Sequence, residues 1–334
     1  MGYLEMSVSK SNLAKIGVIV IATIAMVAFA LYRYDWFPSE EDALEAVRQS
    51  AGEIIRDEQA PGQPVIGLDF SRVRADDSTL RRIRAFRKLE KLDLSGTQVT
   101  DSGMKELRGF KRLHSLKLDG TKITDAGMDS LNDVASLRSL DLNYTELTDA
   151  GLAKLKGLEN LESLNISQTH VTNDGLAELA KLTGLRELGL EFLPIRGEGL
   201  RNLGKVENLE VLSISGWKLT AAELKEIKNI KRLRSLKLTL SPKEIDSGMT
   251  AIAEFSGLES LHLEGELTDA GMKPLKTMVG LRQLRLRYAK ITDDGLMELK
   301  GLKKLELLEL LSHGSVTDEG VHRLQAALPN CRIE

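Results

Sequence analysis

Few of the residue types that build reactive sites occur in this chain of 334 residues. It contains a single cysteine, Cys331, so an intrachain disulfide and a thiolate metal cluster are both excluded. Serines recur at strand positions, but no residue that could act as a general base lies beside them in the sequence pattern. Five histidines are scattered without the spacing of a metal or acid–base motif: His114, His170, His262, His313 and His322. We therefore expect no metal, no cofactor and no enzymatic activity.

Net charge and aromatic residues are also scarce. The chain carries 46 basic and 49 acidic residues, which gives a formal charge of −3. A nucleic-acid-binding protein concentrates lysine and arginine on one face, so no nucleic-acid partner is expected. Aromatic residues make up only 4% of the sequence, so the position of each one carries information.

One long uncharged apolar run, residues 16–32, lies near the N-terminus. Its length is at the short end of the range for a membrane-spanning helix. Lys10 and Lys15 precede the run and only Arg33 closely follows it, which favours a cytoplasmic N-terminal tail over residues 1–15. The sequence thus predicts a single-pass transmembrane helix or signal anchor, with the rest of the chain outside the cytoplasm and periplasmic in a bacterium.

A cleaved signal peptide is the alternative interpretation of this run. Ala28-Phe29-Ala30 has the small-x-small form of a cleavage site, and residues 16–27 could form the apolar segment before it. Cleavage near Ala30 would release a secreted protein. Both interpretations export the remainder of the chain.

The dominant feature is a sequence motif that is repeated over residues 65–334 with a period of about 24 residues. Its form is L-x-x-L-x-L-x-x-T-x-[VIL]-T-D-x-G-[LM]-x-x-L. Eleven copies begin at Val65, Leu89, Leu113, Leu137, Leu161, Leu185, Leu209, Leu233, Leu258, Leu281 and Leu305. No single copy can bury its leucines alone, so neighbouring copies must stack and share one core.

This pattern resembles that of leucine-rich-repeat proteins. The wording Thr-Asp-Ala-Gly-Met at 124–128 and Thr-Asp-Ala-Gly-Leu at 148–152 is similar to the ribonuclease-inhibitor-like and F-box-associated branch, and to bacterial membrane-anchored members; no F-box is seen. The resemblance implies an α/β solenoid, or horseshoe, with an inner parallel sheet and outer short helices. It also implies ligand binding rather than one reaction, and fold alone does not identify the ligand.

Each copy can be interpreted from its residue types. In the copy at Leu113, alternation predicts that Ser115, Lys117 and Asp119 project from the open face of a strand. Thr124-Asp125 then places side-chain oxygens where a helix begins, where they can accept hydrogen bonds from free amide groups. A glycine recurs two residues after that aspartate, which we attribute to close packing of adjacent helices.

Two segments flank the repeats. Residues 33–64 form an acidic linker and N-terminal cap, with a helix after Ser39 and a short strand within residues 52–58. Such a cap would cover the exposed edge of the first repeat. Residues 328–333 are predicted to form a C-terminal closing half-repeat. The oligomeric state is not indicated by the sequence.

The copies over residues 185–257 break the pattern, because Thr-Asp is replaced by Arg196-Gly197 and then by Thr220-Ala221. Neutral drift and a functional irregularity both remain open. Four aromatic residues follow a strand by two or three positions, near the rim of the expected sheet: Tyr144, Phe192, Trp217 and Tyr288. Aromatic side chains are common interface anchors, although filling of wider loop gaps is the simpler explanation.

Charged residues complete the candidate ligand-binding strip. Glu187 and Glu191 lie in the copy that contains Phe192, and Arg285 and Arg287 precede Tyr288. The two arginines are flanked by Glu264 and Glu309 in adjacent copies, so an exposed ion-pair ladder is an equally physical interpretation.

Two classes of function follow. The first is a non-enzymatic, membrane-anchored binding or scaffold protein that holds a protein or peptide on its concave face. The alternative is an extracytoplasmic module that recognises a peptide or glycan in sensing or adhesion. An exposed polar groove with aromatic platforms would favour a glycan, whereas a contiguous apolar patch would favour a protein.

Overall fold

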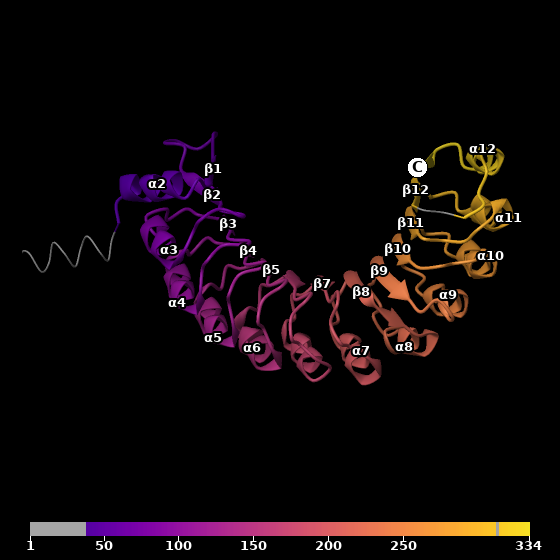
Figure 1. The fold of residues 1–334 in the computed structure, drawn as a ribbon, viewed down its shortest axis with the longest axis horizontal. Coiled ribbons are helices and arrows are strands. Elements are labelled where there is room, and N and C mark those ends of the chain that lie inside the picture. Colours follow the sequence, from indigo (N-terminus) through magenta and orange to yellow (C-terminus); the bar gives the residue numbers. More distant parts are fainter. Residues whose placement is uncertain (1–37, 312–313) are drawn as a thin grey trace, which may run out of the picture.

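The computed structural model describes residues 38–311 and 314–334, without the side chains of residues 217 and 218. These residues form one curved solenoid with a sheet along its inner face and helices along its outer face (Figure 1). The sheet contains thirteen strands that follow one another in chain order. The predicted open solenoid with an inner parallel sheet and outer short helices is confirmed.

Eleven of the strands belong to the repeats and pair in parallel. They are β2 (Val65–Asp69), β3 (Lys91–Asp93), β4 (Ser115–Lys117), β5 (Ser139–Asp141), β6 (Ser163–Asn165), β7 (Glu187–Gly189), β8 (Val211–Leu219), β9 (Ser235–Leu240), β10 (Ser260–Glu264), β11 (Gln283–Arg287) and β12 (Leu307–Leu311). At the two ends lie β1 (Glu53–Arg56), which is antiparallel to β2, and β13 (Arg332–Ile333).

The return segments are short. The α-helices are α2 (Glu40–Gln49), α3 (Asp77–Ile83), α4 (Asp101–Met104), α5 (Asp125–Met128), α6 (Asp149–Lys154), α7 (Gly197–Leu203), α8 (Ala221–Glu226), α9 (Ile245–Ile252), α10 (Asp269–Met272), α11 (Asp293–Met297) and α12 (Asp318–Ala327). Turns of 3₁₀-helix follow or replace them: η1 (Lys105–Gly109), η2 (Asp129–Asp133), η3 (Leu155–Gly157), η4 (Gly175–Lys181), η5 (Lys273–Thr277) and η6 (Glu298–Gly301).

The repeated leucines form one continuous core between sheet and helices. Leu116, Leu140 and Leu164 lie opposite one another on successive strands and are almost completely buried. Burying a leucine side chain contributes about 1.5 to 3 kcal/mol relative to leaving it exposed, so each added repeat extends the stabilising column.

The N-terminal residues of the described chain cover the first repeat. Ser39 caps α2 through a capping box with Asp42, as the sequence predicts. Ala43, Ala46 and Val47 of this helix are buried against the core. The antiparallel strand β1 then occupies the edge that β2 would otherwise expose.

Adjacent repeats are tied together on the outer side by the Thr-Asp pair. Thr124 caps its own helix α5 by accepting a hydrogen bond from the Ala126 N–H, as predicted. Asp125 has a different role from the one predicted, because its carboxylate reaches into the next repeat. Its Oδ1 accepts the Thr148 N–H at 2.8 Å and its Oδ2 accepts the Thr148 hydroxyl at 2.6 Å.

We call this two-bond contact an Asp–Thr rung. Within the described residues, seven rungs join successive repeats: Asp77–Thr100, Asp101–Thr124, Asp125–Thr148, Asp149–Thr172, Asp246–Thr268, Asp269–Thr292 and Asp293–Thr317. Hydrogen bonds to a charged acceptor contribute about 1.5 to 3 kcal/mol, so the rungs are a second link beside the leucine core.

The rungs also explain the repeated glycine. A Cβ on Gly151 would lie 2.1 Å from Asp125 Oδ1, and a Cβ on Gly175 would lie 2.2 Å from Asp149 Oδ1. The attribution to close packing of adjacent helices is confirmed, and the atom in closest contact is a carboxylate oxygen of the preceding helix. The glycine makes room for the carboxylate that arrives from the preceding repeat.

The predicted transmembrane segment, residues 16–32, and the tail before it lie outside the described residues. Within residues 38–311 and 314–334, no helix has the length and apolar character needed to span a membrane.

Candidate functional site

Every regular repeat leaves the concave face through a residue in the left-handed backbone region. These residues follow one another every 24 positions: Arg72, Gly96, Gly120, Tyr144, Gln168, Phe192 and Gly216, with Tyr288 in the same place later in the chain. The left-handed region is natural for glycine and costs a larger residue about 1 kcal/mol or more. The turn therefore favours glycine, and three aromatic residues occupy it instead.

Tyr144, Phe192 and Tyr288 are exposed at these turns. Their exposed fractions are 66%, 53% and 49%. These three side chains are therefore not part of the core, and filling of loop gaps stays the alternative to a binding role. We call the strip that they form, at the carboxyl ends of the strands, the carboxyl rim.

Phe192 is supported from one side by the next repeat. A Cβ on Gly216 would lie 2.3 to 2.7 Å from atoms of the Phe192 ring, so the ring lies directly on the Gly216 backbone. The Phe192 N–H donates to the Ser215 carbonyl at 2.8 Å. The ring is thus positioned but still half exposed. The side chain of Trp217, the fourth predicted aromatic, lies outside the described part of the chain.

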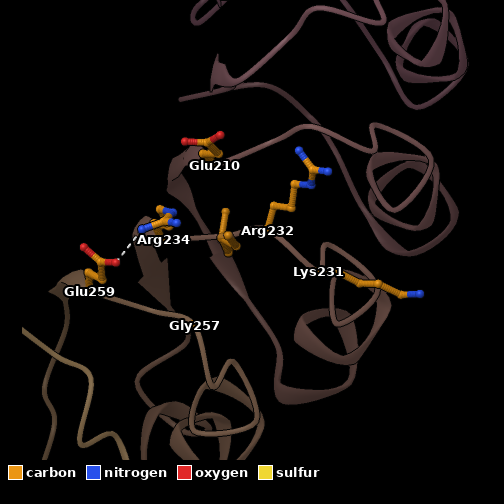
Figure 2. A pocket seen from close by; sticks show the side chains of 7 residues that line it. Glu210, Lys231, Arg232, Arg234, Gly257 and Glu259 are labelled. Carbon is orange, nitrogen blue, oxygen red and sulfur yellow. Dashed lines mark hydrogen bonds and ion pairs between the residues drawn. The ribbon is translucent and has the colours of Figure 1, made fainter.

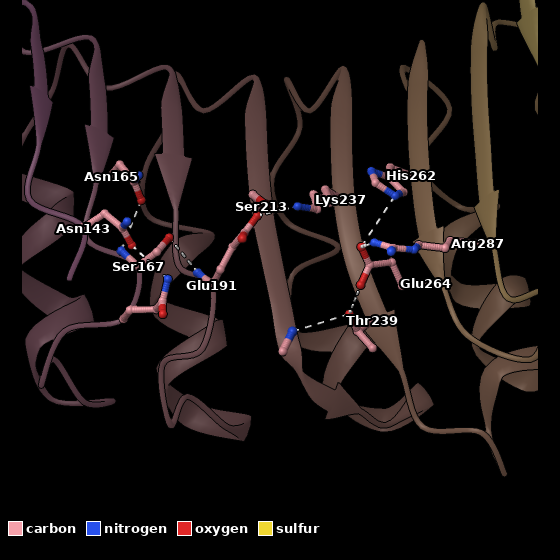
Figure 3. Close-up of polar contacts among 12 residues, drawn as sticks. Asn143, Asn165, Ser167, Glu191, Ser213, Lys237, Thr239, His262, Glu264 and Arg287 are labelled. Atoms are coloured by element: carbon pink, nitrogen blue, oxygen red, sulfur yellow. Dashed lines mark hydrogen bonds and ion pairs between the residues drawn. The ribbon is translucent and has the colours of Figure 1, made fainter. Parts of the chain in front are cut away.

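Below the rim, polar side chains connect neighbouring strands across the concave face (Figure 3). Asn143 Nδ2 donates to Asp119 Oδ1 at 2.6 Å, and Ser167 Oγ accepts the Glu191 backbone N–H at 2.9 Å. Burial raises the pKa of the Asp141 carboxyl, and the nearby Asp119 carboxylate adds to the rise. Negative charge is therefore only partly compensated over β4 and β5.

Glu191 is the centre of this network. Its side chain starts at the end of β7 and Oε1 accepts the Ser213 hydroxyl at 2.6 Å and the Lys237 ammonium at 2.8 Å (Figure 3). Glu191 thereby connects three successive strands. Burial opposes ionisation, but the hydrogen bonds from Lys237 and Ser213 hold the pKa of Glu191 below its usual value.

The Glu191 carboxylate is poorly suited to activate the Ser213 hydroxyl. A serine needs a base with a pKa near the working pH, and Glu191 is a weaker base than an ordinary glutamate. His262, two strands away from Ser213, is a poor candidate too, because burial and then Lys237 lower its pKa. Within the described residues, no group of three or more histidine, cysteine, aspartate or glutamate side chains is placed to hold a metal.

The predicted arginine ladder is present at the C-terminal end of the concave face. Arg285 pairs with Glu309, and Arg287 lies 3.9 Å from Glu264. The side chains of both arginines are about half exposed, at 47% each. Exposed pairs of this kind contribute about 0 to 1 kcal/mol each, so their main effect is to orient the arginines.

Tyr288 lies beside this ladder. The Arg287 guanidinium stacks over the Tyr288 ring at 4.9 Å from the ring centre. The Tyr288 N–H donates to the carbonyl of Leu311, whose side chain is also half exposed. An arginine, a tyrosine and a leucine thus share the surface at this end of the rim.

Comparisons with known proteins agree with this geometry. A leucine-rich-repeat family profile matches residues 111–171, and a second leucine-rich-repeat profile matches residues 87–107 and 281–300. Over these residues the chain matches the sequence pattern of leucine-rich repeats. No curated protein shows a significant match to the sequence. The finer resemblance to the ribonuclease-inhibitor-like and F-box-associated branch stays a prediction.

Solved structures support the same fold. An internalin of Listeria monocytogenes superposes with a TM-score of 0.54 at 19% identity, over 90% of this chain and 96% of the internalin. The Arabidopsis receptor kinase HAESA, solved in complex with the peptide hormone IDA and a co-receptor, gives a TM-score of 0.51 at 17% identity. The latter match covers 84% of this chain and 54% of the HAESA chain.

The opposite edge of the leucine-rich-repeat sheet is a weaker candidate. The amino ends of β8, β9 and β10 line a shallow pocket of about 400 Å³ (Figure 2). Its two glutamates are held in ion pairs, Glu259 with Arg234 at 2.6 Å and Glu210 with Arg186 at 2.5 Å. Arg232 donates to the Asn208 side-chain oxygen at 2.9 Å.

The structure therefore divides the predicted site residues between two places. Tyr144, Phe192 and Tyr288 lie on the carboxyl rim, with Glu191 just below it. Glu187 is exposed at the amino end of β7, away from the rim. Ser213 and Lys237 were not predicted as site residues, because their contact with Glu191 depends on a side chain that crosses two repeats.

Proposed function

We propose that the chain is a non-enzymatic binding module that holds a protein or peptide along the carboxyl rim and the concave face. The observation that supports this most strongly is the exposure of Tyr144, Phe192 and Tyr288 at turns where glycine would be less strained. Costly backbone conformations with exposed aromatic side chains are typical of binding surfaces. Nothing in the folding of the repeats requires an aromatic residue at these turns, because Gly96 and Gly120 serve the same role.

The spacing of the rim residues favours an extended peptide as ligand. Phe192 follows β7 and Tyr288 follows β11, so they are separated by four strand spacings, or about 19 Å. An extended peptide covers that distance with about six residues. The apolar side chains are separate anchors with polar surface between them, which suits a linear chain better than a flat apolar partner. HAESA, which has a similar fold, is solved in complex with the peptide hormone IDA.

A glycan is the second candidate. Its support is the polar network of Asn143, Ser167 and Glu191 between the exposed rings, because sugars stack on aromatic platforms while their hydroxyls bind polar groups. Both candidates would use the same rim.

We also propose that residues 16–32 anchor the module and display it outside the cytoplasm, with secretion after cleavage near Ala30 as the alternative. The support is the length of the apolar run and the lysines that precede it. Protease added to spheroplasts should digest the repeats while a cytosolic control protein survives. Full protection of the repeats would place them inside and contradict the proposal.

The ligand class can be tested with residues 38–334 as a soluble protein. We would select binders from a displayed library of random linear peptides and, in parallel, probe a glycan array. Each hit would be tested against Tyr144→Gly and Tyr288→Gly, with Arg72→Gly as the matched control, since it changes the same turn without removing an aromatic ring.

Peptide hits that weaken with the two tyrosine variants but not with Arg72→Gly support the proposal. Glycans that bind the two tyrosine variants more weakly, but bind Arg72→Gly normally, would identify a glycan as the ligand class instead of a peptide. Hits that bind all three variants equally would place the binding surface away from the rim.

A further inference from the structure

The Asp–Thr rungs are interrupted at two successive junctions in the middle of the solenoid. Gly197 and Ala221 occupy the position of the rung aspartate, and neither has a side chain that can accept a hydrogen bond. The preceding junction lacks the threonine hydroxyl of a rung, because Arg196 occupies the threonine position and donates its N–H to Asn173 Oδ1 at 2.9 Å. Two-bond rungs resume at Asp246.

Two linked positions at the first interruption differ from those of the regular repeats. In a regular pair of repeats, the rung aspartate lies opposite a glycine of the next repeat, as Asp125 lies opposite Gly151. At the first interruption Gly197 takes the place of the aspartate and Glu223 that of the glycine. Without an incoming carboxylate, position 223 has room for a side chain. Glu223 Oε2 accepts the Thr220 N–H at 2.9 Å, so the bond that normally joins two repeats is made within one repeat.

The polar links across these junctions on the outer face include two exposed ion pairs, beside the apolar core that the repeats share. Arg201 pairs with Glu226 at 2.8 Å and Arg196 with Glu223 at 3.5 Å, and both arginine side chains are more than two-fifths exposed. Exposed ion pairs are screened by water and contribute little. At the second junction one bond remains, from the Ala221 N–H to Glu244 Oε2 at 2.8 Å.

The inner face is continuous over the same residues. β8 pairs with β9 in parallel register from Val211–Ser235 to Ile214–Leu238, and Leu212 and Leu236 stay buried. Figure 1 shows α7, α8 and α9 as separate coils on the outside of this unbroken sheet. The strand pairing of the sheet can thus stay intact while the distance between the outer helices changes.

We propose that the solenoid has a built-in hinge over residues 197–245, which include α7 and α8, and that this hinge joins two stiffer arms, residues 77–196 and 246–320. Bending at this hinge changes the curvature of the concave face near Phe192, at the boundary between the arms. The inference does not depend on which ligand the rim binds. It assigns a physical role to the irregular copies at 185–257, for which drift was the alternative.

The hinge can be measured with pairs of spin labels on the full chain. Two pairs occupy equivalent exposed positions on the outer face and are each three repeats apart: Ser102→Cys with Asp174→Cys, and Glu198→Cys with Ala270→Cys. The first pair spans three intact rungs and the second spans both interruptions. The native thiol, Cys331, is buried, and a mock-labelled wild-type chain controls for its reaction.

The proposal predicts a wider distance distribution for the 198/270 pair than for the 102/174 pair. Equal widths would overturn it.

Two rung variants then test the cause. Asp125→Ala removes a rung and should widen the distribution of the 102/174 pair. Ala221→Asp together with Glu244→Thr should narrow the distance distribution of the 198/270 pair, because the two residues have the same 23-residue separation as the Asp101–Thr124 rung. Unfolding is monitored by circular dichroism. If Asp125→Ala leaves a folded chain with an unchanged 102/174 width, the rungs do not set the stiffness and the proposal fails.

Discussion

Single residues in this protein depend on partners one repeat away. Gly151 is needed because the Asp125 carboxylate occupies the space of its Cβ, and Glu223 is tolerated at the equivalent position because Gly197 leaves that space empty. The sequence displays both columns, the aspartates and the glycines. The sequence does not display the contact between an aspartate and a glycine, because the two residues lie in successive repeats and are far apart in the chain.

This dependence predicts a specific pattern of stabilities. Gly151→Ala should lower the free energy of unfolding by about 1 to 3 kcal/mol, because the new Cβ overlaps Asp125 Oδ1. In the background of Asp125→Ala the same substitution should cost less, because only the contact with Leu147 Cδ1, at 2.6 Å, remains. Gly301→Ala is the control, because nothing lies within 4 Å of its added Cβ. Strictly additive effects in denaturant titrations would show that the two residues are independent.

A second prediction at this scale concerns Asp141. Its pKa is raised in the folded protein by burial and by Asp119, so the folded state favours the protonated form. The ionised group therefore costs stability at neutral pH, and this cost disappears as the pH falls through the raised pKa. Asp141→Asn should melt at a higher temperature than wild type at about pH 7, and the difference should shrink towards about pH 4. A variant that melts lower at neutral pH would contradict this.

At the scale of one repeat, the threonine was easier to predict than the aspartate. Thr148 caps its own helix, accepting the Ala150 N–H, and that contact lies within three residues of chain. The carboxylate of Asp125 could satisfy its own helix or the next one, and only the distance between repeats decides. The left-handed turns at Tyr144 and Phe192 were not predicted either. Only some repeats have a glycine at the equivalent position, so the sequence alone did not identify it as a left-handed turn.

Thr148 therefore has two functions that one substitution should remove together. Thr148→Ala loses the helix cap and the hydroxyl that donates to Asp125, and should cost more than the ~1 kcal/mol typical of a cap alone. Thr148→Ser keeps the hydroxyl and should recover most of the loss. Thermal melting of the two variants checks this, and similar midpoints for alanine and serine would rule out the hydroxyl contacts.

Across the whole molecule, the leucine columns were enough to predict the fold. Their period predicted eleven parallel strands in the repeats, and eleven are present among the described residues, with β1 and β13 at the ends. The candidate site was predicted only in part. Aromatic scarcity pointed to Tyr144, Phe192 and Tyr288, whereas the contacts of Glu191 with Ser213 and Lys237 depend on side-chain reach that a single sequence does not display.

The shared core predicts a large effect from one central leucine. Leu140 is almost fully buried between Leu116 and Leu164, so Leu140→Ala should cost about 2 to 5 kcal/mol of unfolding free energy. A loss below about 0.5 kcal/mol, the range typical of surface substitutions, would mean that this column does not form the core.

The central claim is that the aromatic residues of the carboxyl rim serve binding rather than folding. The most direct test is a paired measurement of affinity and melting temperature on Tyr288→Gly, with a peptide selected on the wild-type protein. We predict that affinity falls by about 2 kcal/mol, or roughly thirtyfold, as for an interface anchor. We also predict an unchanged or higher melting temperature, because glycine relieves the left-handed turn. A variant that melts early yet binds the peptide normally would contradict the claim.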